Sequence, residues 1–545
     1  MSLIVNYHDL IEMLDQSVAK YGDLMALDFQ GKSLSYAELG AAVDEMAACL
    51  QAQGVKAGDH VGLCLPNTPY SVIGYFGILK AGGVVVNFNP LYTPYELTHQ
   101  INDSQTHLML TTDLKLITDK LFPLLDHSGL EKIILCPFDQ ILPPVKSVLF
   151  KLVKAKERTK KIDDPRIALL DDLKEKAKNH KVSRRVVAPN QLAVLQYTGG
   201  TTGLSKGAML SHFNITHNVH QVLNRLDNIQ LGQERFLCIL PLFHIFAMTA
   251  LMHLSIATGG RLYLMPRFEL KPCLKMIDQH KITVFPGVPS LFNAIVSAPE
   301  TKKHDLTSLR FCISGGAPLP ITLRQQFKAL TGVGLIEGYG LSETSPVLAV
   351  HPQTDHYREG SIGPALKDTK ISIRNPESPY DEMKQGERGE ICAAGPQIML
   401  GYFNQQEATA KAIIDGWFHT GDIGYMDEDG YIYITDRLKD LILVNGFNVY
   451  PRNVEDALYK HEAVAEVIVI GIDDPQRGQA PKAFVKKKAG HQAVDADALK
   501  DFLKAYLSTI ELPSQIEFRD QLPKTMIGKL SKKELVEEER AKKQS

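Results

Sequence analysis

The chain has 545 residues, of which 44% are hydrophobic and 22% are charged, and these values are typical of a globular protein with two or more domains. A formal net charge of −2 provides no general attraction to nucleic acid, so we expect no nucleic-acid partner. The seven cysteines are scattered without a CxxC pair, which favours reduced thiols in a cytoplasmic protein over a disulfide or zinc framework.

The N-terminal part of the sequence lacks the pattern of an export signal, and no stretch is apolar for long enough to span a membrane.

Ser35 and Glu38 form a capping box that predicts the start of a helix. A strand pattern over 60–66, a helical pattern over 69–83 and a second strand pattern over 84–90 then predict a βαβ unit. Similar patterns recur, so we expect an α/β fold with doubly wound sheets.

From about residue 360 the pattern changes to short strands separated by glycine and proline, which predicts a smaller β-rich subdomain. After residue 436 it changes again, to helices and strands that form an α+β unit of ordinary domain size. We therefore predict a large N-terminal domain over 1–436, with the β-rich subdomain at about 360–436. A small, mobile C-terminal domain is predicted over 437–545.

The segment YTGGTTGLSKG, at 197–207, follows an apolar strand pattern and predicts a phosphate-binding loop. Its glycine amides, its hydroxyls and Lys206 are suitable donors for a polyphosphate. It is not a Walker loop, because Lys206 is followed by glycine and not by serine or threonine. Taken alone, the segment is equally compatible with a surface turn.

Other segments offer complementary groups for a nucleotide. In GYGLSETSP, Tyr339 is suited to stack on a purine, Ser342 to donate to a phosphate and Glu343 to hold a hard cation. In HTGD, Asp422 is suited to accept hydrogen bonds from both ribose hydroxyls. Each of these segments alone is also typical of an ordinary turn.

Together, and in this order, these segments closely resemble those of the adenylate-forming superfamily of acyl-CoA synthetases, luciferases and peptide-synthetase adenylation domains. The resemblance covers nearly the whole chain and also includes SGGAPLP, DRLKD and PKTMIGK. PLFHIFAM, DGWFHTGDIGYMDEDGY and ILVNGFNVYP are most similar to bacterial long-chain fatty acyl-CoA synthetases. The resemblance implies an ATP-dependent ligase that forms an acyl-adenylate and pyrophosphate from a fatty acid, then transfers the acyl group to CoA.

The resemblance also implies a role for each matching residue. The ATP-binding residues would be Thr198, Gly199, Gly200, Thr201, Thr202, Lys206, Gly315, Gly316, Ala317, Tyr339, Gly340, Ser342, Asp422, Arg437 and Lys529. Among them, Lys206 and the residues before it would hold the pyrophosphate, Gly315 to Ala317 with Tyr339 the adenine, and Asp422 with Arg437 the ribose. Glu343 would hold Mg²⁺. The catalytic residues would be Lys529, His244 and Ser342.

The chemistry agrees with these residue types, because a fatty carboxylate is ionised at neutral pH and attacks the α-phosphorus without a general base. The first step then needs positioning and charge neutralisation. For the second step the resemblance implies rotation of the C-terminal domain about Lys439, which brings Gly446 to the CoA pantetheine. A lysine here is also typical of a plain surface charge.

The acyl pocket implied by the resemblance is lined by Phe243, His244, Pro346 and Val347. A histidine in an apolar segment is also typical of simple packing, and this alternative stays open for His244. The C-terminal domain departs from the family at Ile510 and Glu511, where relatives commonly carry a lysine before the proline; this departure puts a CoA or interdomain contact in doubt.

The segment 145–161 combines apolar residues at helical spacing with seven Lys and Arg residues. This pattern indicates either an interfacial helix on an anionic membrane, at the inner face of the cell membrane, or an amphipathic helix packed on its own domain. A homodimer is a further hypothesis. Two other functions stay open, an acyl-AMP ligase that loads a carrier protein and a non-catalytic fatty-acid-binding protein at the membrane surface, and the sequence does not fix the acyl chain length.

Overall fold

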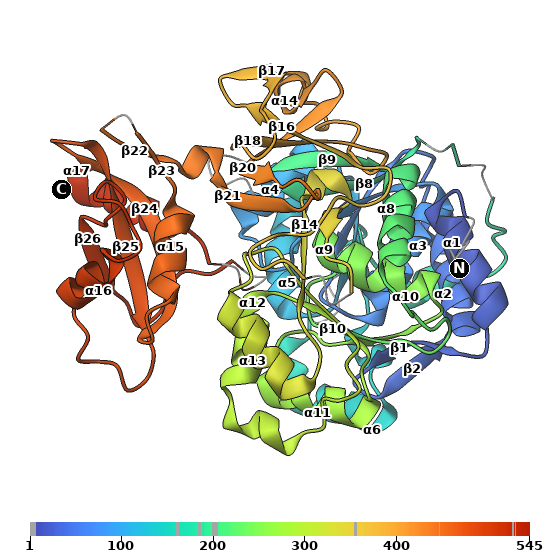
Figure 1. The fold of residues 1–545 in the computed structure, drawn as a ribbon. Coiled ribbons are helices and arrows are strands. Elements are labelled where there is room, and N and C mark those ends of the chain that lie inside the picture. The colour runs from blue at the N-terminus through green and yellow to red at the C-terminus, as the bar shows by residue number, and fades with distance from the viewer. Residues whose placement is uncertain are drawn as a thin grey trace.

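The computed structural model describes residues 7–159, 163–183, 187–188, 190–198, 205–353, 357–445, 447–525, 528 and 530–544. Within these residues the strands form four sheets. Figure 1 shows a large body that contains the N-terminus and a smaller lobe, drawn in orange to red, that contains the C-terminus. The predicted α/β fold with a small C-terminal part is therefore confirmed.

A seven-stranded sheet forms one half of the large body, in the order β7-β6-β5-β3-β4-β8-β9. Its strands are β3 (His60–Cys64), β4 (Val84–Asn87), β5 (Leu108–Thr112), β6 (Lys132–Cys136), β7 (Ile167–Leu169), β8 (Leu192–Thr198) and β9 (Lys206–Ser211). All neighbours are parallel except β8 and β9. The predicted βαβ unit is confirmed, because α3 (Pro69–Ala81) joins the parallel strands β3 and β4, and all of its residues except Lys80 are buried.

An eight-stranded sheet forms the other half, in the order β15-β14-β13-β12-β10-β11-β1-β2. Its strands are β1 (Met25–Phe29), β2 (Lys32–Ser35), β10 (Arg235–Cys238), β11 (Arg261–Leu264), β12 (Val284–Gly287), β13 (Phe311–Gly315), β14 (Ile336–Gly340) and β15 (Val347–Val350). Only the two edge pairs are antiparallel. One hydrophobic core joins both halves, so the two sheets act as a single rigid support.

Helices cover these sheets. They include α1 (Leu10–Tyr21), α2 (Tyr36–Ala52), α4 (Pro94–Asp103), α5 (Lys115–Leu121), α6 (Pro144–Val153), α7 (Leu170–Ala177), α8 (His212–Arg225), α9 (Ile245–Ala247), α10 (Leu254–Ala257), α11 (Leu270–His280), α12 (Pro289–Ser297) and α13 (Ile321–Thr331). The capping box predicted at Ser35 and Glu38 is confirmed at the start of α2.

The β-rich pattern after residue 360 is confirmed as an antiparallel sheet of six strands. Its strands are β16 (Lys370–Asn375), β17 (Ser378–Glu382), β18 (Gly389–Ala394), β19 (Ile413–Ile414), β20 (Trp417–Met426) and β21 (Ile432–Arg437), with α14 (Gln406–Ala412) beside them. The sheet lies at the top of the body in Figure 1, next to β9.

The C-terminal lobe has its own five-stranded sheet and its own hydrophobic clusters. Its elements are β22 (Ile442–Val444), β23 (Phe447–Val449), α15 (Pro451–Tyr459), β24 (Val464–Asp474), β25 (Gly478–Lys487), α16 (Ala496–Leu503), β26 (Gln515–Phe518) and α17 (Lys533–Gln544). A separate core is the feature that defines a domain, but the boundary at residue 436 stays a prediction.

The segment 145–161 contains a short helix, α6, none of whose residues is buried. Val145, Val148, Leu149, Leu152 and Val153 are exposed, so the alternative in which these apolar side chains pack on their own domain is wrong. Residues 160–162 lie outside the described residues. Among the described helices, none is long and apolar enough to cross a membrane.

Candidate active site

The predicted adenine segment lies at the carboxyl ends of two neighbouring parallel strands. Gly315 ends β13 and Gly340 ends β14, with Gly315 opposite Gly338 in the sheet. A side chain at residue 340 is excluded, because a Cβ atom there would lie 1.8 Å from the carbonyl oxygen of Pro346. Gly316 has φ +75, a conformation that glycine adopts readily, and Ala317 follows it. This edge of a parallel sheet is where α/β folds bind ligands.

Tyr339, Asp422 and Arg437 form one hydrogen-bonded group. The Tyr339 hydroxyl donates to Asp422 Oδ2 at 2.6 Å, and Arg437 Nε lies 2.8 Å from Asp422 Oδ1. Asp422 on β20 faces Arg437 on β21 across the sheet, so strand pairing holds the ion pair. Asp422 is buried, and its carboxylate raises the pKa of Arg437. Burial, and then Asp422, raises the pKa of Tyr339 well above its usual value.

Glu343 and Lys206 are connected through a residue that the sequence analysis missed, Tyr402. The Tyr402 hydroxyl donates to Glu343 Oε1 at 2.8 Å, while Lys206 Nζ lies 5.1 Å from the centre of the Tyr402 ring. Backbone pairing supports this arrangement, because Tyr402 forms a β-bridge with Ala208 of β9. Tyr402 carried no signal in the sequence, since it lies in an ordinary Gly-Tyr-Phe stretch, far along the chain from both partners.

The Glu343 carboxylate is buried, and burial raises its pKa above the usual value. The hydrogen bond from Tyr402 and the charge of Arg437 oppose this shift, while the charge of Asp422 adds to it. Because these electrostatic effects require proximity, Glu343, Asp422 and Arg437 occupy one region of the protein. Tyr402 donates to Oε1 only, and no described side chain donates a hydrogen bond to Glu343 Oε2. This oxygen is a hard ligand of the kind that Mg²⁺ prefers, so the residue fits the predicted metal role.

The predicted phosphate loop connects two paired strands, β8 and β9, in which Thr198 faces Lys206. Gly199, Gly200, Thr201 and Thr202 lie outside the described residues, as do Gly446 and Lys529. Ser342 begins the short helix Ser342–Thr344, directly after the end of β14. The structure therefore brings Thr198, Lys206, Ser342 and Glu343 to neighbouring strand ends.

The predicted acyl-binding segments lie beside the adenine segment. His244 caps α9, where its Nδ1 accepts a hydrogen bond from the Phe246 backbone amide at 3.3 Å. A Cβ atom added to Gly315 would lie only 3.1 Å from the Phe246 ring. The helix α9, which carries Phe246, therefore contacts the end of β13. A π-helix, Met248–His253, follows α9. Such turns are frequent at functional sites because they redirect side chains within a helix.

Phe243 and Val347 are fixed by amide side chains of the core. The Phe243 carbonyl accepts a hydrogen bond from Gln196 at 2.9 Å, and Val347 exchanges two hydrogen bonds with Asn218, at 3.0 and 2.8 Å. Pro346 precedes Val347 and is buried. A cavity of about 10 Å³, enough for one water molecule, adjoins Phe243.

The C-terminal lobe contacts this region through Gly528, the residue before Lys529 in the sequence. The Gly528 carbonyl accepts a hydrogen bond from the Ser290 hydroxyl at 2.9 Å. Ser290 lies in the first turn of α12, just after the end of β12.

Lys439, the predicted hinge residue, lies in the short helix Leu438–Asp440, directly after β21. Loss of hydration, together with the charge of Arg437, lowers the pKa of Lys439.

Buried carboxyl groups occupy the contact between the two lobes. Asp436 accepts the backbone amide of Arg452 at 2.9 Å, and burial raises the pKa of Asp436 to about 6. Glu337 on β14 accepts the backbone amide of Leu319 at 3.2 Å, and burial raises its pKa to about 7. The charge of Arg452 opposes the shift at Glu337, so the C-terminal lobe influences a group in the large body.

Residues 14–403 match the AMP-binding enzyme family, and residues 453–529 match the AMP-binding enzyme C-terminal domain. The chain belongs to the AMP-binding enzyme family. The expectation of an adenylate-forming enzyme is therefore confirmed.

Similar proteins agree with this assignment. A long-chain-fatty-acid–CoA ligase of Bacillus subtilis is 40% identical over 97% of this chain and 94% of its own length. A long-chain-fatty-acid–CoA ligase of Salmonella typhimurium is 38% identical over 98% of this chain and 95% of its own. The solved structure of ATP-bound MatB from Rhodopseudomonas palustris is 27% identical with a TM-score of 0.84, covering 97% of this chain and 98% of that one. Apo MatB matches with a TM-score of 0.76.

Proposed function

We propose that the protein is an ATP-dependent long-chain fatty acid:CoA ligase. In the first step a fatty carboxylate attacks the α-phosphorus of ATP, forming an acyl-adenylate and releasing pyrophosphate. In the second step the CoA thiol attacks the acyl carbonyl, forming the thioester and releasing AMP. The names of the relatives at 40% and 38% identity support the substrate class.

One observation carries this proposal: the group of Tyr339, Asp422 and Arg437 lies within electrostatic range of Glu343, which Tyr402 connects to Lys206. A nucleotide needs such an arrangement, because its ribose, its base and its phosphates require different partners at fixed separations. The buried Asp422 carboxylate is suited to accept the ribose hydroxyls, and Lys206 to hold the departing pyrophosphate.

Charge neutralisation is the main requirement of the first step, because the carboxylate and the triphosphate repel each other. In this proposal Glu343 holds Mg²⁺, which neutralises phosphate charge when it is bound. Ser342 donates to the α-phosphate. Lys529, which follows Gly528 in the sequence, bridges the carboxylate and the α-phosphate. His244 orients the acyl carbonyl, and Phe243, Pro346 and Val347 line the acyl pocket.

The second step no longer needs Lys529. The proposal is that the C-terminal lobe rotates about Lys439 and presents the segment around Gly446 to CoA. The agreement with ATP-bound MatB, TM-score 0.84 against 0.76 for apo MatB, supports an orientation of the lobes suited to the first step. The contact between Gly528 and Ser290 supports the same orientation, because it holds Gly528, the residue before Lys529, against the large body.

The experiment is a turnover panel with ATP, CoA and acids ranging from acetate through aromatic acids to saturated fatty acids of increasing length. The proposal predicts AMP, pyrophosphate and acyl-CoA, with the highest kcat/KM for the long chains. Highest turnover on acetate or aromatic acids would contradict the substrate assignment. An acyl-AMP ligase would transfer the acyl group to a carrier protein and not to CoA, so both acceptors are included.

The protein is further proposed to work in the cytoplasm and to contact the inner face of the membrane through residues 145–161, where its substrate partitions. A homodimer is the proposed assembly, to be tested by light scattering. A non-catalytic fatty-acid-binding protein is the less favoured function, because Lys206, Glu343, Asp422 and Arg437 are all present and all but Lys206 are interlinked by charge. Pyrophosphate release that depends on fatty acid would exclude it.

A further inference from the structure

The helix α6 presents its apolar side chains to solvent. Val145, Val148, Leu149, Leu152 and Val153 are exposed by 80%, 59%, 57%, 75% and 67%. At about 100° per residue these five positions span an arc of about 140° on one side of the helix. The opposite side carries Phe150, whose ring lies 5.1 Å from that of Phe138 in the body. The helix is thus anchored by its inner face, and its outer face has no cover within the described chain.

Basic side chains border this apolar arc on both sides. In the helical projection Lys146 lies beyond one edge and Lys151 beyond the other. Lys146 Nζ donates to the Gln30 carbonyl at 2.7 Å, and Lys151 Nζ lies 2.7 Å from Asp139 Oδ2. Both ammonium groups are therefore held by groups of the body beside the helix. Long basic side chains at the edges of an apolar face are suited to the boundary between lipid tails and headgroups.

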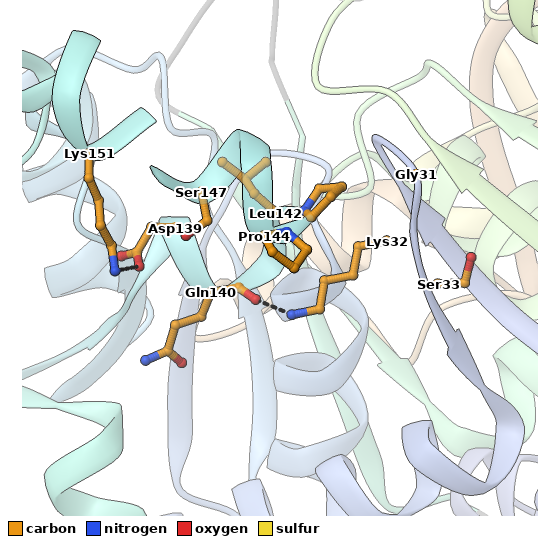
Figure 2. Close-up of a pocket in the computed structure, with 10 residues that line it drawn as sticks. Gly31, Lys32, Ser33, Asp139, Gln140, Leu142, Pro144, Ser147 and Lys151 are labelled. Atoms are coloured by element: carbon orange, nitrogen blue, oxygen red, sulfur yellow. Dashed lines mark hydrogen bonds and ion pairs between the residues drawn. The ribbon is translucent and has the colours of Figure 1, made fainter. Parts of the chain in front are cut away.

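A pocket of about 520 Å³ opens beside α6, between this helix and the turn that joins β1 and β2. Figure 2 shows Lys32 and Lys151 at the pocket, with Asp139 next to Lys151 and Ser147 on the helix. Arg158 Nη2 lies 2.9 Å from the other oxygen of Asp139 and 3.0 Å from Asp113 Oδ2, so Arg158 and Lys151 together balance these two carboxylates. Lys32 donates to the Gln140 carbonyl and adds a positive charge across the pocket from α6.

We propose that α6 lies in the plane of an anionic phospholipid bilayer, with its apolar arc among the acyl chains and a lipid phosphate in the adjoining pocket, next to Lys32. The proposal deepens the membrane contact of the proposed function and assigns its residues. A helix of 10 residues is too short to span the bilayer, but it is long enough to lie in the interface. The bilayer would hold the fatty acid that the proposed ligase consumes.

The charge pattern favours a bilayer over a second copy of the chain. Two copies that met through this arc would bring their lysine borders together, and juxtaposed like charges oppose association. One short helix is also a small interface compared with those of stable dimers. An anionic bilayer offers acyl chains to the apolar arc and negatively charged headgroups to the lysines at its borders.

The test is co-sedimentation of the full chain with vesicles of phosphatidylcholine, with and without phosphatidylglycerol. We expect binding that is weak on pure phosphatidylcholine, much stronger with phosphatidylglycerol, and weakened by salt, because lysines supply part of the attraction. The double variant Leu149→Gln/Leu152→Gln should bind at least about tenfold more weakly, since two exposed leucines lose their burial in lipid. Leu116→Gln is the matched control, because Leu116 on α5 is 65% exposed and lies outside the arc.

Lys32→Gln tests the pocket. It should weaken binding to phosphatidylglycerol vesicles about fivefold and leave the weak binding to pure phosphatidylcholine unchanged. Insertion is measured with Leu152→Cys carrying an environment-sensitive dye. All seven native cysteines are buried, so the new thiol reacts selectively. We expect a blue shift of the dye emission on phosphatidylglycerol vesicles.

Three results would overturn the proposal: equal binding of the double variant and the parent, binding that is indifferent to lipid charge, or dye emission that vesicles do not shift. A parent dimer that the double variant converts to a monomer, without vesicle binding, would assign the arc to a second copy. Each variant is also assayed for pyrophosphate release with detergent-dispersed fatty acid. Turnover should be unchanged, so a failure of membrane binding and a failure of the ligase function give different results.

Discussion

Replacement of Glu337 by glutamine should stabilise the protein above neutral pH. Burial raises the pKa of this carboxyl from 4.5 to about 7, and the difference corresponds to about 3 kcal/mol. The sign follows from proton binding. Because the folded state holds the proton more tightly than the unfolded state, the parent loses stability as pH rises from about 4.5 to about 7. Glutamine has no proton to lose, and its carbonyl oxygen can still accept the Leu319 amide.

Urea unfolding of parent and variant, followed by circular dichroism and by the fluorescence of Trp417, the only tryptophan, measures this effect. The variant should be more stable by about 3 kcal/mol near pH 8, and the advantage should shrink to about 1 kcal/mol near pH 5. In an Arg452→Gln background the pH midpoint should move upward, because Arg452 lowers the pKa of Glu337. A stability difference that is independent of pH, or a less stable variant near pH 8, would refute the reasoning.

Three further predictions concern the site. Tyr402→Phe removes the donor to Glu343 and should raise the Mg²⁺ concentration for half-maximal pyrophosphate release about tenfold; an unchanged Mg²⁺ titration would contradict the role of the pair. Gly340→Ala should abolish turnover and lower the free energy of unfolding by about 3 kcal/mol, because the new Cβ would lie 1.8 Å from a carbonyl oxygen. In the control Gly338→Ala the nearest atom would be 3.5 Å away, so a loss of similar size there would remove the steric explanation. Lys529→Ala should slow adenylation about a hundredfold or more while supplied acyl-AMP still reacts with CoA, and equal damage to both steps would exclude domain rotation.

The sequence was informative where local pattern and local chemistry coincide. The βαβ unit of β3, α3 and β4 follows from short apolar strands around a helix closed by glycines. The sequence predicted only that Asp422 and Arg437 bind the same ribose. The structure adds that the two residues face each other on adjacent strands. Motif order thus predicted which segments form the site, but the contacts between these segments depend on strand register, which one sequence does not specify.

Two features could not be predicted because they depend on contacts between distant segments. Tyr402 joins Glu343 to Lys206 only because its segment pairs with β9, and nothing in its local sequence indicates that pairing. The outward orientation of the α6 arc was equally open. The spacing of the apolar residues in the sequence shows that they share one face of the helix. The packing of Phe150 against Phe138 in the body turns that face towards solvent.

The most direct test of the central claim, that these residues form one site for acyl-adenylate formation, is the exchange of labelled pyrophosphate into ATP without CoA. The account predicts exchange that requires both a long-chain fatty acid and Mg²⁺, and that Asp422→Asn reduces strongly, because the first step is reversible and uses this site alone. Exchange that does not depend on fatty acid, or release of ADP and phosphate in place of AMP and pyrophosphate, would contradict it.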